Sequence, residues 1–151
     1  MFELIRSMRI DVENGRASAE AFVEADHPLF GDHFPGSPLL PGSLMIELAA
    51  QLSGPLAEEF AKTRMGNERW AILGMVRDAR FLRPVFLPAT LDLSAEVIRS
   101  ETSTLNTNVI VEVEAERVMQ SQLVMMMIET STEMAQAIDA RNNRLARWKA
   151  S

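Results

Sequence analysis

Apolar and polar residues alternate along most of the chain. Alternation with a period of two is typical of β-strands that have one face on a core and the other in water. The segments that show this pattern are residues 6–13, 16–24, 91–97 and 109–116. Asn14-Gly15, which lies between the first two segments, tolerates the positive φ angles of a tight turn, so we expect a hairpin there.

Other apolar segments do not alternate so simply. Residues 123–128 (LVMMMI) are apolar at every position, which indicates a central strand or one covered on both faces, for example by a partner subunit. Residues 70–76 and 79–85 indicate one further strand or a pair, ended by Pro84 and Pro88. The chain therefore holds about six strands.

Residues 43–54 (SLMIELAAQLSG) predict a helix, because they are too long and too rich in Leu and Ala for a strand. The helix is expected to begin at Gly42, after Pro41. Ser43, Glu47 and Gln51 are spaced by four and form one narrow polar stripe. The rest of the surface is apolar, so the helix must be enclosed. Pro55 is expected to kink or end it, with residues 56–62 emerging into solvent.

Six antiparallel strands and one long buried helix predict an α+β fold in which the sheet wraps around a central helix, the hot-dog arrangement. The alternative, a helix lying flat on one face of the sheet, would expose half of its apolar surface. We assign the hot-dog domain to residues 1–131 and a C-terminal basic amphipathic helix or tail to residues 132–151. The apolar stripe of this tail consists of Met134, Ile138, Leu145 and Trp148.

Composition narrows the classes of function. The 151 residues carry a net charge of -6, which argues against nucleic acid as a partner. The sequence has no cysteine, which excludes disulfides, a thiolate zinc site and a cysteine nucleophile. We find no leader-like segment and no uncharged stretch of the ~18 residues that span a membrane, and we expect a soluble, cytoplasmic protein. A site that uses imidazole must use His27 or His33.

His33 and Glu47 are the candidate acid–base residues. Prolines stiffen the loop over residues 26–42, which holds His33 before the helix. Glu47 follows His33 by 14 residues and has apolar neighbours in sequence, so we expect it to be buried and protonated, as a general acid requires. The alternatives are a loop histidine bonded to backbone and a first-turn carboxylate that complements the helix dipole.

Two motifs resemble the β-hydroxyacyl-acyl carrier protein dehydratases, a FabZ-like family with the hot-dog fold. The first is His33-Phe34-Pro35-Gly36, followed by Pro38, Leu40-Pro41-Gly42, Glu47 and Gln51, and the second is the ARFLRPV sequence of residues 79–85. The resemblance extends over roughly residues 5–131. It departs from the family at Asp32, where the family has glycine.

The resemblance implies dehydration of β-hydroxyacyl thioesters to trans-2-enoyl thioesters, in fatty-acid, lipid or polyketide synthesis. His33 would remove the α-proton and Glu47 would protonate the departing hydroxyl, the two coming from different subunits. Gly42 would offer a backbone N–H to the thioester oxygen, and Phe34 would contact substrate. Gln51 would either orient the Glu47 carboxyl or serve helix packing. The alternatives are an enoyl hydratase, a thioesterase, or a catalytically silent carrier-binding subunit, which Asp32 keeps open.

The implied partners are an acyl carrier protein and further copies of this chain, as a homodimer or a trimer of dimers. Carrier proteins are acidic, so docking needs a local basic patch. One candidate patch is Arg77, Arg80 and Arg83, and the other is the basic tail, whose alternative role is to pack on the domain. We expect no cofactor and no metal, because the Asp26-His27 and Asp32-His33 pairs lack further ligands.

Overall fold

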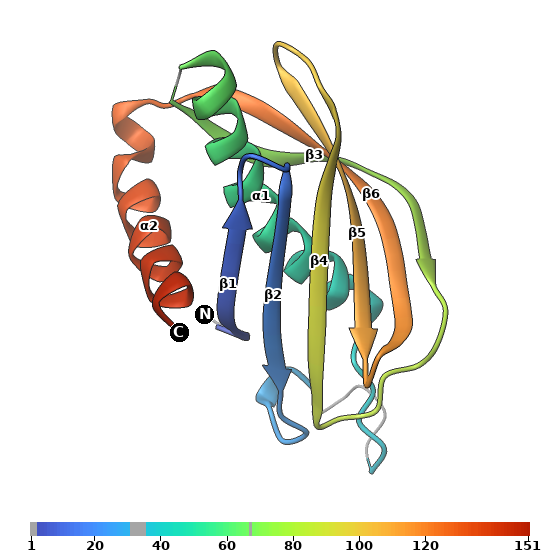
Figure 1. The fold of residues 1–151 in the computed structure, drawn as a ribbon. Helices are drawn as coiled ribbons and strands as arrows, with labels where there is room; N and C mark the ends of the chain where they lie inside the picture. Colours follow the sequence, from blue (N-terminus) through green and yellow to red (C-terminus); the bar gives the residue numbers. More distant parts are fainter. Residues whose placement is uncertain (1–2, 31–35, 67) are drawn as a thin grey trace.

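The computed structural model of this chain describes residues 3–30, 36–66 and 68–151. One antiparallel sheet of six strands, in the order β1-β2-β4-β5-β6-β3, forms the body of the protein (Figure 1). The strands are β1 (Ile5–Asp11), β2 (Arg16–Val23), β3 (Arg69–Phe81), β4 (Ala89–Ser100), β5 (Thr104–Val113) and β6 (Glu116–Glu129). The helices are α1 (Gly42–Met65) and α2 (Ala135–Ala150), with short 3-10 turns at Pro28–Phe30 and Thr132–Met134. The predicted antiparallel sheet of about six strands is confirmed.

Period-two alternation correctly identified which face of the strands is buried. In β2, the four residues Ala17, Ala19, Ala21 and Val23 are buried, and the residues between them are largely exposed. The predicted hairpin between β1 and β2 is confirmed, although its turn spans four residues, 12–15, rather than two. Gly15 has a φ of 62°, which glycine adopts without steric cost.

The apolar segments that do not alternate lie at and beside one edge of the sheet. Residues 70–81 belong to a single strand, β3, which pairs only with β6 and is therefore an edge strand. β6 lies between β5 and β3, in agreement with a central strand. Met125 and Met127 of β6 face the core, whereas Met126, on the opposite face, is 44% exposed.

Helix α1 begins at Gly42 as predicted, but it does not end or emerge into solvent at Pro55. It continues to Met65 and stops where Gly66 adopts a left-handed φ of 70° and donates its N–H to the Lys62 carbonyl. A proline inside a helix costs ~3 kcal/mol. Full burial of Leu56, together with Ala57 and Ala61, offsets this cost, since a leucine side chain alone gains ~1.5–3 kcal/mol.

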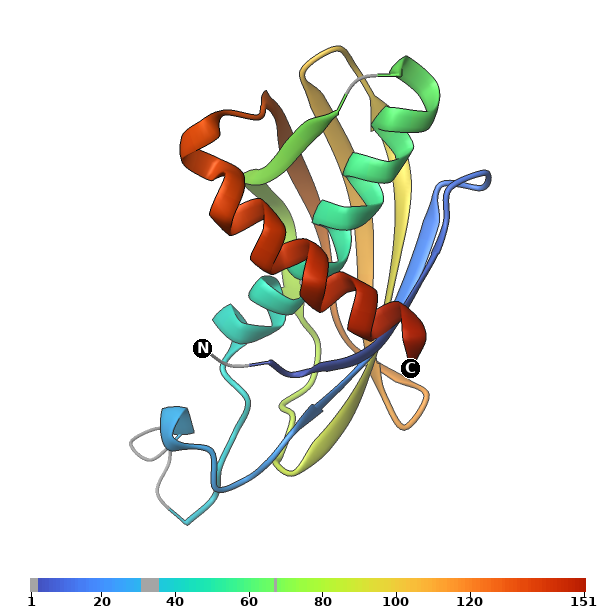
Figure 2. The same cartoon turned by 90° about the vertical axis from the view of Figure 1, so that its left-hand side faces the viewer.

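The helix lies against one face of the sheet and is not enclosed on every side. A buried hydrogen bond of 2.9 Å between the hydroxyls of Ser53 and Thr107 joins α1 to β5. Helix α2 packs beside β1 and crosses the outer side of α1 (Figure 2). The remaining flank of α1, which includes Ser43 and Glu47, is exposed. The predicted enclosure is therefore wrong for the single chain, in which α2 covers only part of the helix.

Candidate active site

Glu47 and Gln51 form a hydrogen-bonded pair on α1. The Gln51 side-chain amide donates through Nε2 to Oε1 of Glu47 over 3.0 Å. Residues four apart on a helix lie one above the other, so the spacing that placed them on one stripe also brings them together. This hydrogen bond is the contact that the expected orienting role of Gln51 requires.

Glu47 is exposed in the single chain, so the expectation of a buried carboxyl is wrong there. That expectation rested on the apolar residues next to Glu47 in sequence, such as Leu44 and Leu48. Adjacent residues of a helix point in different directions, and these two leucines face the core while Glu47 faces outward.

A groove of about 480 Å³ runs along α1 beside the Glu47–Gln51 pair. Three elements form it. Its lining consists of Glu47, Ala50, Gln51, Gly54 and Pro55 of α1, residues 70–73 of β3 with Met125 of β6, and Arg141, Arg144 and Trp148 of α2. Most of this surface is apolar, and the groove therefore suits an alkyl chain. The carboxyl of Glu47 lies beside such a chain as part of the lining.

The start of α1 meets the second family-like motif. The N–H of Leu40 donates to the carbonyl of Val85 over 2.9 Å, and the N–H of Leu87 donates to Pro38 over 3.0 Å. The Phe81 ring lies over Gly42, where a Cβ would be only 2.8 Å from the ring carbon Cε1. Glycine at this position therefore lets the aromatic ring approach the first turn of the helix.

A second pocket, of about 340 Å³, lies at this end of α1 and is lined by Gly42, Met45, Phe81 and Arg83, among others. The N–H groups of Leu44 and Met45 donate to the Pro41 carbonyl. The N–H groups of the first two helical residues, Gly42 and Ser43, come before the first hydrogen bond within the helix. Such N–H groups and the helix dipole favour negative charge. This pocket can therefore stabilise a developing oxyanion.

His33 and Phe34 lie outside the described residues. His27 is described: its ring packs against Phe30 with the centroids 5.5 Å apart, at the far end of the 26–42 loop from α1. In the parts of the chain that the structure describes, no three His, Asp or Glu side chains gather as metal ligands would. None of the helices described is long and apolar enough to cross a membrane.

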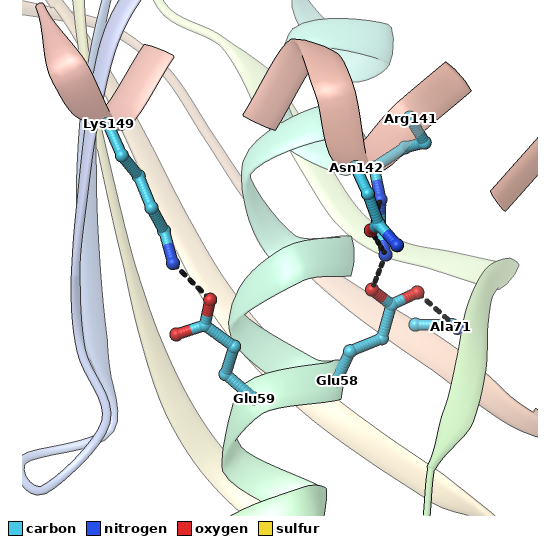
Figure 3. Close-up of polar contacts among 6 residues, drawn as sticks. All are labelled: Glu58, Glu59, Ala71, Arg141, Asn142 and Lys149. Carbon is cyan, nitrogen blue, oxygen red and sulfur yellow. Dashed lines mark hydrogen bonds and ion pairs between the residues drawn. The ribbon is translucent and has the colours of Figure 1, made fainter. Parts of the chain in front are cut away.

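Glu58 is a buried carboxylate that the sequence reasoning missed (Figure 3). Its side chain is 10% exposed, accepts the Ala71 N–H over 2.9 Å, and pairs with the guanidinium of Arg141. Burial raises the pKa of Glu58, although the Ala71 N–H and Arg141 both act to lower it. The sequence did hold a sign of this carboxylate: Glu58 is seven residues, or about two helical turns, after Gln51 and so lies on the same stripe of the helix as Glu47 and Gln51.

The basic residues of α2 are directed towards the domain. Arg141 pairs with Glu58, Arg147 with Glu3, and Lys149 with Glu59. Trp148 is buried, and Ile138 and Leu145 are half-buried. The tail therefore packs as an amphipathic helix, which favours this expected role over a free basic patch.

Comparison with known proteins finds relatives over most of the chain. A profile of the FabA-like domain matches residues 1–122. The 3-hydroxyacyl-[acyl-carrier-protein] dehydratase FabZ of Mannheimia succiniciproducens is 34% identical over 116 residues, which are 76% of each chain. The protein of the same name from Myxococcus xanthus is 29% identical over 115 residues, covering 76% of this chain and 74% of the relative.

Solved structures show the same fold at low sequence identity. The dehydratase heterocomplex ApeI:P of Xenorhabdus doucetiae superposes with a TM-score of 0.66 at 15% identity, covering 90% of this chain and 89% of the other. A Streptococcus mutans protein bound to acetyl CoA gives 0.64 at 16% identity, covering 87% and 94%. The fold and the profile match thus define a hot-dog protein of the FabA-like class. Within that class, the chain belongs to the FabZ-like β-hydroxyacyl-acyl carrier protein dehydratase family.

Proposed function

We propose that this protein dehydrates β-hydroxyacyl thioesters carried on acyl carrier protein, giving trans-2-enoyl thioesters in fatty-acid synthesis or a related lipid or polyketide pathway. Membership of the FabZ-like family carries the proposal. The Glu47 carboxyl, oriented by Gln51 at the edge of an apolar groove, supports it from the structure.

The reaction needs one base and one acid. His33 takes the proton from the α-carbon, and the electrons of the broken C–H bond form the double bond. Glu47 gives a proton to the β-hydroxyl, which leaves as water. The N–H of Gly42, at the first position of α1, stabilises the negative charge that develops on the thioester oxygen. Phe34 contacts the substrate in this proposal.

A second copy of the chain completes the site. Edge strand β3 exposes Leu73, Met75 and Val76, which are 39–54% exposed, and Leu73 lines the same groove as Glu47. An apolar edge strand with unpaired backbone groups favours pairing with another strand. A homodimer formed along β3, alone or as a trimer of dimers, would cover this edge, enclose α1 as a central helix and bring His33 of one subunit towards Glu47 of the other.

The carrier protein would dock at the start of α1. Arg80 pairs with Asp78 and Arg83 with Glu116, each over 3.0 Å and all strongly exposed. Exposed pairs of this kind exchange readily, so the guanidinium groups stay available to an acidic partner. Arg83 also lines the pocket beside Gly42, and Arg77 lies on the same exposed strand.

The test is the reverse reaction, hydration of crotonyl and longer enoyl thioesters, followed by loss of enoyl absorbance. His33→Ala and Glu47→Gln should each lower kcat by about 10²–10⁴. Glu96→Gln, at an exposed ion pair on β4, is the matched control and should keep full activity. The proposal fails if the parent protein hydrates no chain length or if His33→Ala retains full activity. Release of free thiol instead would identify a thioesterase.

Mixing subunits tests the shared site. A dimer of one His33→Ala chain and one Glu47→Gln chain retains one complete pair only if each site takes its two residues from different subunits. Co-refolding the two inactive variants should therefore restore activity, whereas refolding either one alone should not. No recovery from a verified mixed dimer would show that the two residues act within one chain.

A further inference from the structure

The groove beside Glu47 is bordered by helix α2, a boundary that the proposed chemistry does not require. Glu47, Gln51, Gly54 and Pro55 line one flank of α1, and Glu58 follows on the same side. From Glu47 to Glu58 the helix advances about 16 Å, at about 1.5 Å a residue. Small residues make the floor: a Cβ added at Gly54 would lie 4.0 Å from its nearest neighbour, Met125.

Helix α2 borders the groove near the part of α1 that holds Glu58. It crosses α1, as Figure 2 shows, and contributes Arg144 and Trp148 to the groove. The crossing is fixed by Arg141, which pairs with Glu58 and stacks over Trp70 at 4.5 Å from the ring centroid. Helix α2 lies beyond residues 1–122, which the FabA-like profile matches.

The chemistry of the lining indicates an alkyl occupant of limited length. Leu73, Met125 and Trp148 offer apolar surface, into which methylene groups transfer favourably from water. The guanidinium groups of Arg141 and Arg144 stand beyond this surface on α2. An alkyl chain that extended further would have to displace these side chains and break the Arg141–Glu58 ion pair, which is unfavourable.

We propose that α2 is the end wall of the acyl groove and that Trp148, with Arg144, sets the longest acyl chain that the protein accepts. The ligand is the unbranched acyl chain of a thioester, with its reacting carbons at Glu47. This inference rests on the proposed function for the identity of the ligand. Trp148 acts here as a specificity residue and takes no part in the proton transfers.

Two substitutions with opposite effects test the wall. Trp148→Leu shortens the side chain that closes the groove, and Gly54→Leu fills its floor from the opposite side. Arg147→Ala is the matched control, since Arg147 is on α2 but pairs with Glu3 outside the groove. For each variant, kcat/KM is measured with enoyl thioesters of increasing length. Binding of saturated acyl pantetheines, which cannot react, is measured over the same lengths by calorimetry.

We expect Trp148→Leu to raise the ratio of long-chain to short-chain kcat/KM, by about tenfold for each methylene newly accommodated, and Gly54→Leu to lower it. Arg147→Ala should leave the ratio unchanged. Melting temperatures identify any variant that fails to fold, and Gly54→Leu remains informative if Trp148→Leu is unfolded. The wall is refuted if a folded variant of each kind leaves both length profiles unchanged. If no enoyl thioester turns over but the binding profiles shift as expected, the proposed function fails while the wall stands.

Discussion

Replacing Arg141 with methionine should destabilise the protein by about 3 kcal/mol, because it leaves a buried carboxylate without its cation. The side chains of Arg141 and Glu58 are only 17% and 10% exposed. Removing one partner of a buried pair costs roughly 3–5 kcal/mol, since the other charge stays desolvated. The lower end applies here because Glu58 keeps the hydrogen bond from the Ala71 N–H and can take up a proton. Methionine keeps the apolar contact with Trp70 and removes only the charge.

Thermal unfolding followed by circular dichroism measures the effect. For a chain of this size, about 3 kcal/mol corresponds to a fall in Tm of roughly 6–12 °C. Arg147→Met is the matched control on the same helix, because its pair with Glu3 is 62% and 42% exposed. Exposed pairs contribute at most ~1 kcal/mol, so this variant should stay within about 4 °C of the parent.

A double-mutant cycle separates the ion pair from the loss of the side chain. Glu58→Gln removes the buried charge that Arg141 neutralises, so the Arg141→Met/Glu58→Gln variant should be more stable than the two single effects predict, by about 2 kcal/mol. Limited proteolysis of α2 shows whether the helix detaches before the domain unfolds. If Arg141→Met costs no more than Arg147→Met, the buried pair does not hold α2 in place.

Three further predictions follow from single contacts. Burial raises the pKa of Glu58 above its ordinary value of 4.5, so the stability this group contributes is complete below that pH and is lost as the pH rises through the folded-state pKa. In urea unfolding from pH 4 to 7, Glu58→Gln should therefore gain on the parent protein as the pH rises, and a constant difference would contradict this. Ser53→Ala should cost about 1–3 kcal/mol in the same assay, because it leaves the buried Thr107 hydroxyl unpaired, and Ser53→Ala/Thr107→Val should recover part of it. Gly54→Ala should raise the Tm by about 1–4 °C, since alanine is favoured in a helix by ~0.5–1 kcal/mol and its Cβ would be 4.0 Å from Met125; a lower Tm would mean that the site is more crowded than the structure shows.

Local patterns predicted the features that local physics determines. The alternation in β2 identified its buried face, and the spacing of Glu47 and Gln51 identified their contact. The passage of α1 through Pro55 depends instead on the burial of residues 56, 57 and 61 against the sheet. No local signal at a proline reports how much apolar surface the following turn will bury.

The contribution of α2 to the candidate site also could not be predicted from local sequence patterns. Arg141 and Glu58 are 83 residues apart in sequence, and charge counting alone could not show that the basic tail pairs with glutamates of the domain. Which flank of α1 stays open depends on where α2 crosses it. The exposure of Glu47 was therefore beyond prediction from the residues that surround it in sequence.

A second copy of the chain that paired along β3 would cover both the open flank of α1 and the apolar edge of the sheet. Glu47 lies on the side of α1 that α2 leaves uncovered, and Leu73 of β3 lines the same groove. A copy of the chain that pairs along β3 removes Met75 and Val76 from water and at the same time places a second surface over Glu47. In the proposed dimer, the contact that stabilises the sheet edge also completes the site around Glu47, so a substitution such as Val76→Lys should abolish dimerisation and hydration together.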